Sequence, residues 1–543
     1  MSFKKNSIQK YITMLLVLIL MGSILLFCLK SFSKIDQRFN GDEIHYLTLA
    51  KKGIVYNALE KNSLNFIEFY KIGKARADRD TILNNQLVKK YNYPDESENP
   101  FYLRHYHPPM ATYYWSFFSV NENIIINDLS LRKSNMWLGI IAIIIFVFSL
   151  CLARVFNKTT MIVTFCLLIL LVSSIIFSYS FERINFHTFQ FIFASLYIAF
   201  FTNWLKANTL RNSIFLGVST AGMFVTLETA LFIVFGSLIS LIIIKKVKQF
   251  FKSFVYLFLS FLATMFILWP GVFKTFAPIK TWIMHFARIF LKGNDEYASV
   301  KIGKVWQSLY MDNLLLFSVL IVVSLFLLLY SRQKLTSKIY LAPYIISIIY
   351  LLTISPFILN KTYIFPALSL IIFSIIFNLN DLKNDDNVKK MSLKASYFSL
   401  VIGGLGLFIS HNNFDYNEEK LLYKTKKKVL IDELSSLKEI LKNKNNVLAF
   451  NGQFYKYYLN DDSIIEMRKN KATNPGYYIR EKGLYKDVLP DIKNNKYEAI
   501  IIPTIYLNFY TESRTKILKD YNYHKKEFEN FIIFLLNDNL TTK

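Results

Sequence analysis

Two short polar stretches that follow the first apolar run hold the residue types best suited to chemistry. The first is GDEIHY, in which Asp42 and Glu43 are adjacent carboxylates. The second is YLRHYHPPM, which carries a guanidinium and two imidazoles at Arg104, His105 and His107. Carboxylates and imidazoles can exchange protons, and a guanidinium can hold an anion. The pattern favours a reaction centre at one membrane surface; the alternative is a solvated acidic pair behind a signal anchor.

The composition is that of a membrane protein. Of the 543 residues, 53% are hydrophobic, and the mean hydropathy is +0.30. Several charge-free runs are long enough to span the ~30 Å hydrocarbon layer of a bilayer. The formal net charge of +26 does not indicate a nucleic-acid partner, because Lys and Arg cluster in short segments between the apolar runs. The cysteines all lie in apolar runs and indicate neither disulfides nor a metal site: Cys28, Cys151 and Cys166.

Charge-free runs predict about eleven membrane spans. The first, Tyr11–Leu29, has a Lys-rich start and is predicted to remain uncleaved, because no small-residue cleavage site follows it. The region Asn212–Ile244 is too long for one span, and both of its flanks are basic. It is therefore predicted to cross twice, with Glu228 at the outer turn. The remaining predicted spans are Ser134–Ala153, Thr159–Phe181, Ile184–Leu205, Ser253–Phe273, Asn313–Ser331, Ile339–Asn360, Thr362–Asn380 and Ala395–Ser410.

The basic residues predict the orientation of the chain. Short segments on the side of the N-terminus are rich in Lys and Arg, whereas those on the other side hold only Arg183 and Lys361. The positive-inside rule then places the N-terminus in the cytoplasm and the C-terminus outside the plasma (inner) membrane. Within the long first outer loop, Asp42–Glu60 has apolar residues at roughly helical spacing. We expect this stretch to form a helix that lies on the bilayer.

The C-terminal region has the composition of a soluble domain. VLIDELSSLKEILKN predicts a helix, and NVLAF, SIIEM, YEAIIIP and FIIFLL predict short buried strands. YKDVLPDIKNN and ESRTKILKDY are predicted helices between them. The predicted fold class is a polytopic α-helical membrane protein whose long first outer loop carries interfacial helices, with a small C-terminal α/β soluble domain outside. The membrane domain is predicted to cover residues 1–410 and the α/β domain residues 411–543.

The predicted topology places one set of ionisable residues together on the outer side. Charged groups at a membrane are expensive unless they are paired or wetted. Their convergence predicts a polar cavity that opens outward; the alternative is that each one is an interfacial anchor. The set consists of Asp42, Glu43, Arg104, His105, His107, Glu182, Arg183, Glu228 and Lys361.

Four motifs in order resemble the glycosyltransferase C superfamily. GDEIHYLTLAKKG resembles the acidic motif of its first loop, and YLRHYHPPMATYYW resembles the second loop signature. LRKSNMWLGIIAIII resembles the start of the second span, and NKTYIFPALSL a late outer motif. The most similar families are the bacterial lipid A aminoarabinose transferases and the protein O-mannosyltransferases. The chain departs from them at three positions, where the families often have Lys, Lys and an acidic residue: His107, Glu228 and His187.

The resemblance implies an inverting transfer of a hexose or pentose from a polyprenyl-phosphate donor to a hydroxyl of a cell-envelope glycolipid, glycan or protein. It implies Asp42 as the base, with Glu43 orienting the acceptor or holding a cation. The residues expected to hold the donor phosphate are Arg104, His107, Lys361 and Tyr363. His105, Glu182 and Arg183 complete the predicted substrate-binding set. For Tyr363 the alternative is an aromatic anchor in the interface.

Three alternatives remain open. No cofactor is assigned, but His105 and His107 with Asp42 or Glu43 could ligate a divalent ion. A transporter or flippase of lipid-linked sugars would share the basic inner side and the polar cavity. It would, however, favour charges at mid-membrane and repeated halves, whereas no second copy of GDEIHY occurs. A structural or assembly protein would leave the polar cluster of the first loop without a role.

Overall fold

The computed structural model describes most of the helical region and much of the C-terminal region. The described ranges, apart from a few isolated residues, are 2–33, 42–60, 66–78, 107–118, 124–275, 341–354, 364–381, 427–449, 452–459, 464–466, 494–504 and 523–537. Several sequence predictions lie outside the described residues: the spans Asn313–Ser331 and Ala395–Ser410, the helix ESRTKILKDY, nearly all of the helix YKDVLPDIKNN, and the site residues Arg104, His105, Lys361 and Tyr363.

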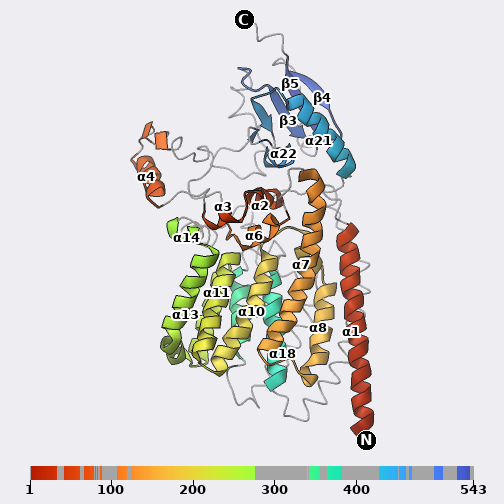
Figure 1. The fold of residues 1–543 in the computed structure, drawn as a ribbon, viewed down its shortest axis with the longest axis vertical. Helices are drawn as coiled ribbons and strands as arrows, with labels where there is room; N and C mark the ends of the chain where they lie inside the picture. Colours follow the sequence, from red (N-terminus) through yellow and green to blue (C-terminus); the bar gives the residue numbers. More distant parts are fainter. Residues whose placement is uncertain are drawn as a thin grey trace.

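A bundle of apolar helices forms the body of the molecule (Figure 1). Its members are α1 (Ser2–Ser33), α7 (Ile124–Leu152), α8 (Lys158–Ser173), α9 (Ile175–Glu182), α10 (His187–Lys206), α11 (Leu210–Thr226), α12 (Ala230–Ile243), α13 (Val247–Leu268), α17 (Leu341–Ile354) and α18 (Phe365–Asp381). Four stretches in the described part of the chain are long and apolar enough to cross a membrane: Tyr11–Leu29, Leu131–Leu152, His187–Lys206 and Val247–Leu268. The chain is therefore a membrane-embedded protein.

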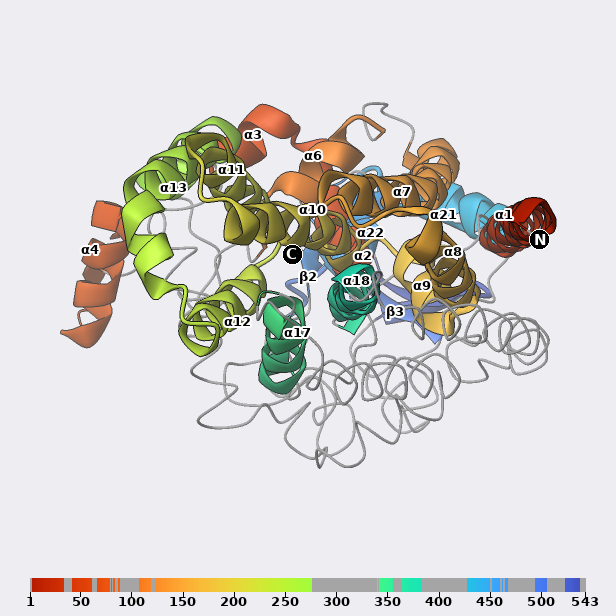
Figure 2. The same cartoon turned by 90° about the horizontal axis from the view of Figure 1, so that it is seen from below.

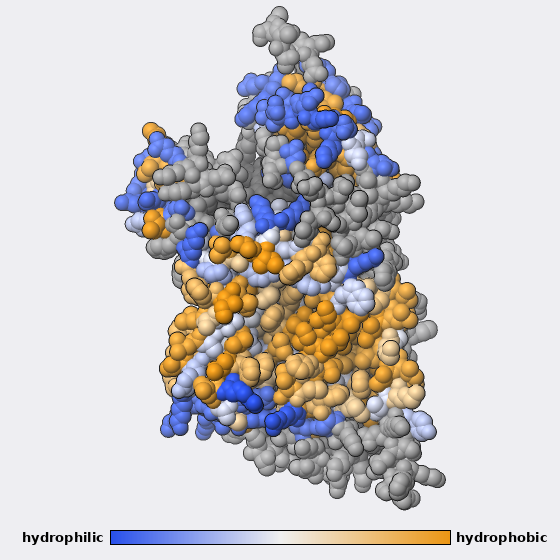
Figure 3. Space-filling model, viewed as in Figure 1, coloured by the Kyte–Doolittle hydropathy of each residue, from blue (hydrophilic) through white to orange (hydrophobic). Residues whose placement is uncertain are grey.

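Burial separates central from peripheral helices. Within the apolar window of α10, 78% of the residues are buried, and this helix packs against α7, α11 and α18. In α13 the share is only 11%, and several of its phenylalanines are exposed, among them Phe251, Phe254 and Phe266. Figure 2 shows α10 inside the bundle and α1 at its edge. On the face seen in Figure 3, apolar side chains form a broad band over the helices, as contact with lipid requires.

The region predicted to cross twice is broken where expected. Helix α11 begins after Thr209, whose hydroxyl accepts a hydrogen bond from the amide of Asn212. It ends at Thr226, and α12 begins at Ala230, so Glu228 lies in the turn between them. The prediction of two helices with Glu228 at their turn is confirmed. Gly217 lets α11 pack closely on α13, because a Cβ there would lie 2.4 Å from the Leu257 carbonyl oxygen.

The loop between α1 and α7, predicted to lie outside, is more broken than expected. It contributes α2 (Asp42–Lys51), α3 (Ile54–Ala58), α4 (Phe66–Ala77) and α6 (Met110–Ser116). Gly53 separates α2 from α3 with a φ of 84°, a value that favours glycine. The single helix predicted over Asp42–Glu60 is therefore wrong. In Figure 1, α2, α3 and α6 lie across one end of the bundle, and α1 begins at the opposite end.

A second predicted helix is also interrupted. The charge-free run Thr159–Phe181 forms α8 and α9 instead of one span, with Ser174 between them. The Ser174 hydroxyl accepts a hydrogen bond from the Phe177 amide and caps α9. The run has no charge to mark the break, so apolar length alone predicted a continuous helix. At the far end of α13, α14 (Gly271–Lys274) follows after a short turn.

The C-terminal region folds around a five-stranded mixed sheet with the order β2-β1-β3-β5-β4. Its elements are α21 (Lys427–Leu441), β1 (Val447–Ala449), α22 (Gly452–Leu459), β2 (Ile465–Glu466), β3 (Ala499–Pro503), β4 (Tyr523–Glu527) and β5 (Phe531–Leu536). Strand β1 pairs in parallel with β2 and β3, whereas β5 pairs antiparallel with β3 and β4. The predicted helix α21 and the four predicted strands are confirmed; β4 and α22 were not predicted.

Candidate active site at one end of the bundle

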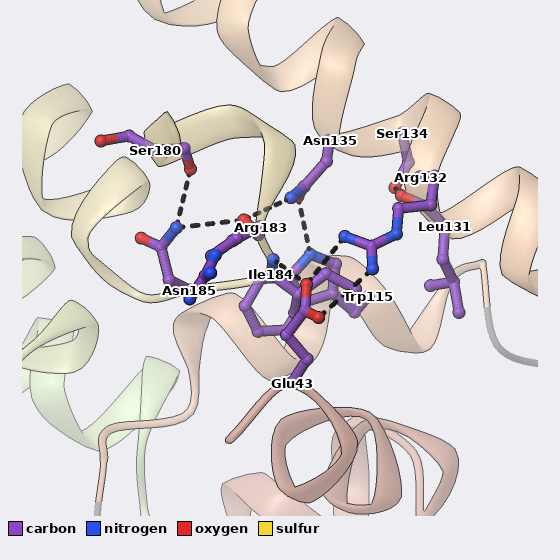
Figure 4. Close-up of polar contacts among 10 residues, drawn as sticks. All are labelled: Glu43, Trp115, Leu131, Arg132, Ser134, Asn135, Ser180, Arg183, Ile184 and Asn185. Atoms are coloured by element: carbon purple, nitrogen blue, oxygen red, sulfur yellow. Dashed lines mark hydrogen bonds and ion pairs between the residues drawn. The ribbon is translucent and has the colours of Figure 1, made fainter. Parts of the chain in front are cut away.

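A buried ion pair joins the loop that follows α1 to the bundle (Figure 4). Arg132 Nη1 donates to Glu43 Oε1 at 2.8 Å, and Nη2 donates to Oε2 at 3.2 Å. The backbone amide of Ile184 also donates to Glu43 Oε1, at 3.0 Å. Glu43 is 4% exposed and Arg132 is 7% exposed. The two-pronged geometry suits a carboxylate, and it fixes the start of α2 to α7 and to the turn before α10.

Asparagine side chains organise the same junction. Asn135 Nδ2 donates to the Arg183 carbonyl oxygen at 2.7 Å, and its Oδ1 accepts from Trp115 Nε1 at 3.3 Å. Asn185 Oδ1 accepts from the amides of His187 and Thr188 and so caps the start of α10. These bonds tie α7 to α6 and to the turn between α9 and α10, with backbone groups as the main partners.

A second buried pair links the loop before α6 to the turn between α11 and α12. His107 Nδ1 and Glu228 Oε2 are 3.0 Å apart, and both side chains are buried. Around the imidazole lie the ring of Phe186, with its centroid 4.7 Å away, and that of Tyr46, 5.7 Å away. Because a carboxylate only accepts, His107 presents a protonated Nδ1 to Glu228. These residues are 121 positions apart, yet both were predicted on the outer side.

A third junction attaches the loop to the end of α13. Trp269 Nε1 donates to Glu60 Oε1 at 2.7 Å, and the Tyr113 hydroxyl donates to the Leu268 carbonyl oxygen at 2.6 Å. Burial raises the pKa of the Tyr113 hydroxyl, and the nearby carboxylate of Glu60 raises this pKa further. Tyr113 therefore remains protonated and continues to donate its hydrogen bond at ordinary pH.

No family model matches the sequence, and no curated protein matches it. Solved structures do. The crystal structure of ArnT from Cupriavidus metallidurans bound to undecaprenyl phosphate aligns with a TM-score of 0.57 at 8% identity, over 96% of this chain and 98% of that one. The apo structure of the same protein gives a TM-score of 0.52 at 9% identity, over 95% and 97% of the two chains.

The chain has the fold of ArnT. Coverage of nearly the whole of both chains means that the helical bundle and the C-terminal sheet region are matched together. The resemblance to the glycosyltransferase C superfamily, drawn from four sequence motifs, is thereby confirmed at the level of the fold. The oligosaccharyltransferase of Archaeoglobus fulgidus also aligns, with a TM-score of 0.43 at 10% identity.

Within this ArnT fold, some of the predicted site residues lie at the junctions described above, and the others lie outside the described residues. His107 lies at the second buried pair, with Glu228. Asp42 is the first residue of α2 and Glu182 the last residue of α9, which places both backbones at the junction that Glu43 and Arg132 form. Arg183 follows directly, and its carbonyl oxygen accepts from Asn135 and Asn185. The residues outside the described part are Arg104, His105, Lys361 and Tyr363.

Arg132 is the residue that the sequence analysis missed. It stands in the motif LRKSNMWLGIIAIII, whose resemblance to the start of the second span gave this residue no role. The available signal was a guanidinium at the predicted outer start of a span, on the same predicted side as a loop with two adjacent carboxylates.

In the part of the chain that the structure describes, no group of three or more His, Cys, Asp or Glu side chains is arranged to hold a metal ion.

Replacement of Glu228 tests the second buried pair. Glu228→Leu removes the acceptor of the His107 Nδ1–H and is expected to lower stability by about 1–3 kcal/mol. Glu228→Gln keeps a carbonyl oxygen at this position and is expected to lose less. The measurement is the thermal unfolding midpoint of each purified variant in detergent. Equal losses in the two variants would contradict the hydrogen-bonded arrangement.

Proposed function

We propose that the chain is a membrane glycosyltransferase that uses a polyprenyl-phosphate-linked sugar. It moves the sugar, with inversion, to a hydroxyl of a cell-envelope acceptor on the outer side of the membrane. The observation that carries this proposal is the buried bond between Glu43 and Arg132, which fixes the helix that begins at Asp42 across the end of the bundle. The ArnT fold supports it, because one matching structure was solved with undecaprenyl phosphate.

Asp42 is the base in this proposal. Its carboxylate takes the proton of the acceptor hydroxyl as that oxygen attacks the anomeric carbon of the donor. The bond between this carbon and the phosphate oxygen breaks, and the polyprenyl phosphate leaves with the bonding electrons. A general base matters here because an unassisted hydroxyl is a weak nucleophile. The residue begins α2 at the bundle's end, where a lipid headgroup and an acceptor from outside can meet.

Glu43 has a different role from its neighbour. Both of its oxygens accept hydrogen bonds from Arg132, and one also accepts from the amide of Ile184. A carboxylate held in this way is suited to position α2. We therefore propose that Glu43 orients Asp42, rather than contacting the acceptor or a cation as the sequence suggested.

The departing phosphate gathers negative charge and needs cationic donors. We propose Arg104, His107, Lys361 and Tyr363 for this role, with His105, Glu182 and Arg183 lining the rest of the site. His107 lies beside α2, next to the Tyr46 ring, and Glu228 holds its imidazole. Since this hydrogen bond uses Nδ1, any contact with phosphate would come from Nε2.

Transfer and transport can be separated by one experiment. The purified chain in nanodiscs is incubated with polyprenyl-phosphate sugars and an extract of envelope acceptors. A glycosyltransferase releases free polyprenyl phosphate, and mass spectrometry detects the added sugar on the acceptor. A flippase leaves the sugar–phosphate bond intact. Donor lipid that is moved between leaflets but never cleaved would overturn the proposed function.

The proposal also requires one orientation in the membrane. We propose that the N-terminus lies in the cytoplasm of a plasma (inner) membrane protein, and that a membrane domain at residues 1–410 is followed by an outer domain at residues 411–543. Reporter fusions after Asn380 are expected to read as cytoplasmic, and fusions at the C-terminus as external, because basic segments stay inside. A cytoplasmic C-terminus would contradict this orientation and remove the sheet from the proposed outer site.

A further inference from the structure

Helix α2 is held at both ends by the membrane part of the chain. At its start, Glu43 binds Arg132 of α7. Near its end, the Ser116 hydroxyl of α6 donates to the Ala50 carbonyl oxygen at 2.7 Å. Asn57 Nδ2 donates to the Leu49 carbonyl oxygen at 2.8 Å. Carbonyl groups at a helix end have no partner within the helix, so these bonds stabilise the last turn of α2.

The outer side of α2 is covered by the C-terminal region. Lys51, the last residue of α2, donates from Nζ to the Tyr457 carbonyl oxygen at 3.2 Å. The same ammonium lies 3.9 Å from the centroid of the Tyr457 ring, a cation–π distance. Tyr457 belongs to α22, and Figure 1 shows α22 directly over α2. One side chain thus ties the helix that carries Asp42 to the sheet region.

The partner surface on α22 is well ordered by its own packing. Tyr457 is 3% exposed, and its ring lies 5.1 Å from that of Tyr458, which in turn lies 4.6 Å from Phe454. A half-buried ammonium against a buried ring is stronger than an exposed surface pair, because water competes less for it. A cation in the last turn of a helix also interacts favourably with the helix dipole.

We propose that Lys51 is a positioning residue, through which the C-terminal sheet region holds α2, and with it Asp42, in the geometry that transfer needs. This inference rests on the proposed function, in which Asp42 takes the proton of the acceptor. The sheet region is then a working part of the site instead of an appended domain. Small displacements of a catalytic group are costly: about 1 Å can cost on the order of a hundredfold in rate.

The test uses full-length protein in nanodiscs with polyprenyl-phosphate sugar as donor. Lys51→Met keeps the length of the side chain and removes its charge. We expect kcat for transfer to fall by about tenfold, with little change in the KM for donor. Peptides that cover α2 should exchange amide hydrogen for deuterium faster. Lys51→Arg, which keeps the charge and its donors, should restore most of both properties.

Lys52→Met is the matched control. Lys52 is adjacent and exposed, and its ammonium lies 5.2 Å from the ring of Tyr56 in α3, not against α22. This variant should behave as the wild type. From the other side of the contact, Tyr457→Leu removes the ring but keeps the backbone carbonyl that accepts from Lys51, so it should cause part of the loss seen in Lys51→Met. Tyr457→Phe also keeps an aromatic face and should lose less.

Three outcomes would overturn either the positioning role of Lys51 or the proposed function. Lys51→Met with the same kcat and the same exchange as Lys52→Met would overturn the inference. Faster exchange in α2 at an unchanged kcat would make the contact structural only and would also overturn the positioning role. Wild-type protein that cleaves no donor would instead overturn the proposed function, and the positioning role with it.

Discussion

Replacement of Asp42 by Asn is expected to lower the rate of sugar transfer by about 10²-fold or more, the usual scale for loss of a general base. Asn has nearly the same shape but cannot take a proton from the acceptor hydroxyl. It also remains a good residue at the start of a helix, so α2 should still form after the change. The measurement is single-turnover transfer from a polyprenyl-phosphate sugar in nanodiscs, which separates the chemical step from donor binding.

Asp42→Glu is the matched comparison for Asp42→Asn, because it keeps a carboxylate at this position. Glu keeps the base but moves it by one methylene, so an intermediate rate is expected. Donor affinity should be similar in both variants, because neither removes a cation from the phosphate. If Asp42→Asn retained the full rate, Asp42 would not be the base, and Glu182 at the end of α9 would become the next candidate to test.

The helices of the bundle could be predicted from the sequence because lipid imposes a simple rule. Every backbone polar group in the hydrocarbon layer needs a partner inside the chain, so long charge-free runs become helices. The break at Glu228 was also predictable, because the basic residues on both flanks required an even number of crossings. The break at Ser174 was not, since a hydroxyl in an apolar run is compatible both with a continuous helix and with a cap.

Among the C-terminal strands, too, only those with a clear apolar pattern could be predicted from the sequence. Strands β3 and β5 are continuous apolar runs, so their apolar composition was enough to predict them as buried strands. Strand β4 lies at the edge of the sheet, and of its residues only Tyr523 is buried. Its sequence YHKKE has no alternation that would indicate a half-buried strand. Pairing with β5, a contact made by the backbone, forms this strand, and backbone pairing leaves little trace in side-chain pattern.

For the site, the sequence predicted on which side of the membrane its residues lie, but not which of them form the buried pairs Glu43–Arg132 and His107–Glu228. Orientation rules placed Asp42, Glu43, His107 and Glu228 together, and the structure brings the described members of this set to one end of the bundle. The partner of Glu43 is Arg132, which is 89 residues away on α7. The sequence indicated α7 only as an apolar membrane span. Spacing carries no information over such a separation, because the contact depends on how α2 folds back across α7.

The bond between Glu43 and Arg132 leads to the second large expected effect. Arg132→Met leaves the Glu43 carboxylate buried without its main counter-ion. Removal of one member of a buried ion pair costs about 3–5 kcal/mol. A marked drop in the thermal unfolding midpoint in detergent is therefore expected. Lys133→Met is the matched control, since Lys133 is the next residue, is exposed, and should tolerate the same change with almost no loss.

The double variant Glu43→Gln with Arg132→Met distinguishes an ion pair from simple packing. With both charges removed, no uncompensated carboxylate remains, and the amide oxygen of the introduced side chain can still accept from the backbone amide of Ile184. The double variant should therefore be more stable than Arg132→Met by itself, which is the sign of a coupled pair. Its transfer rate should nevertheless stay below that of the wild type, because a neutral pair holds the start of α2 less firmly. If the two substitutions destabilised the protein additively, the pair would not be the device that fixes Asp42 at the end of the bundle.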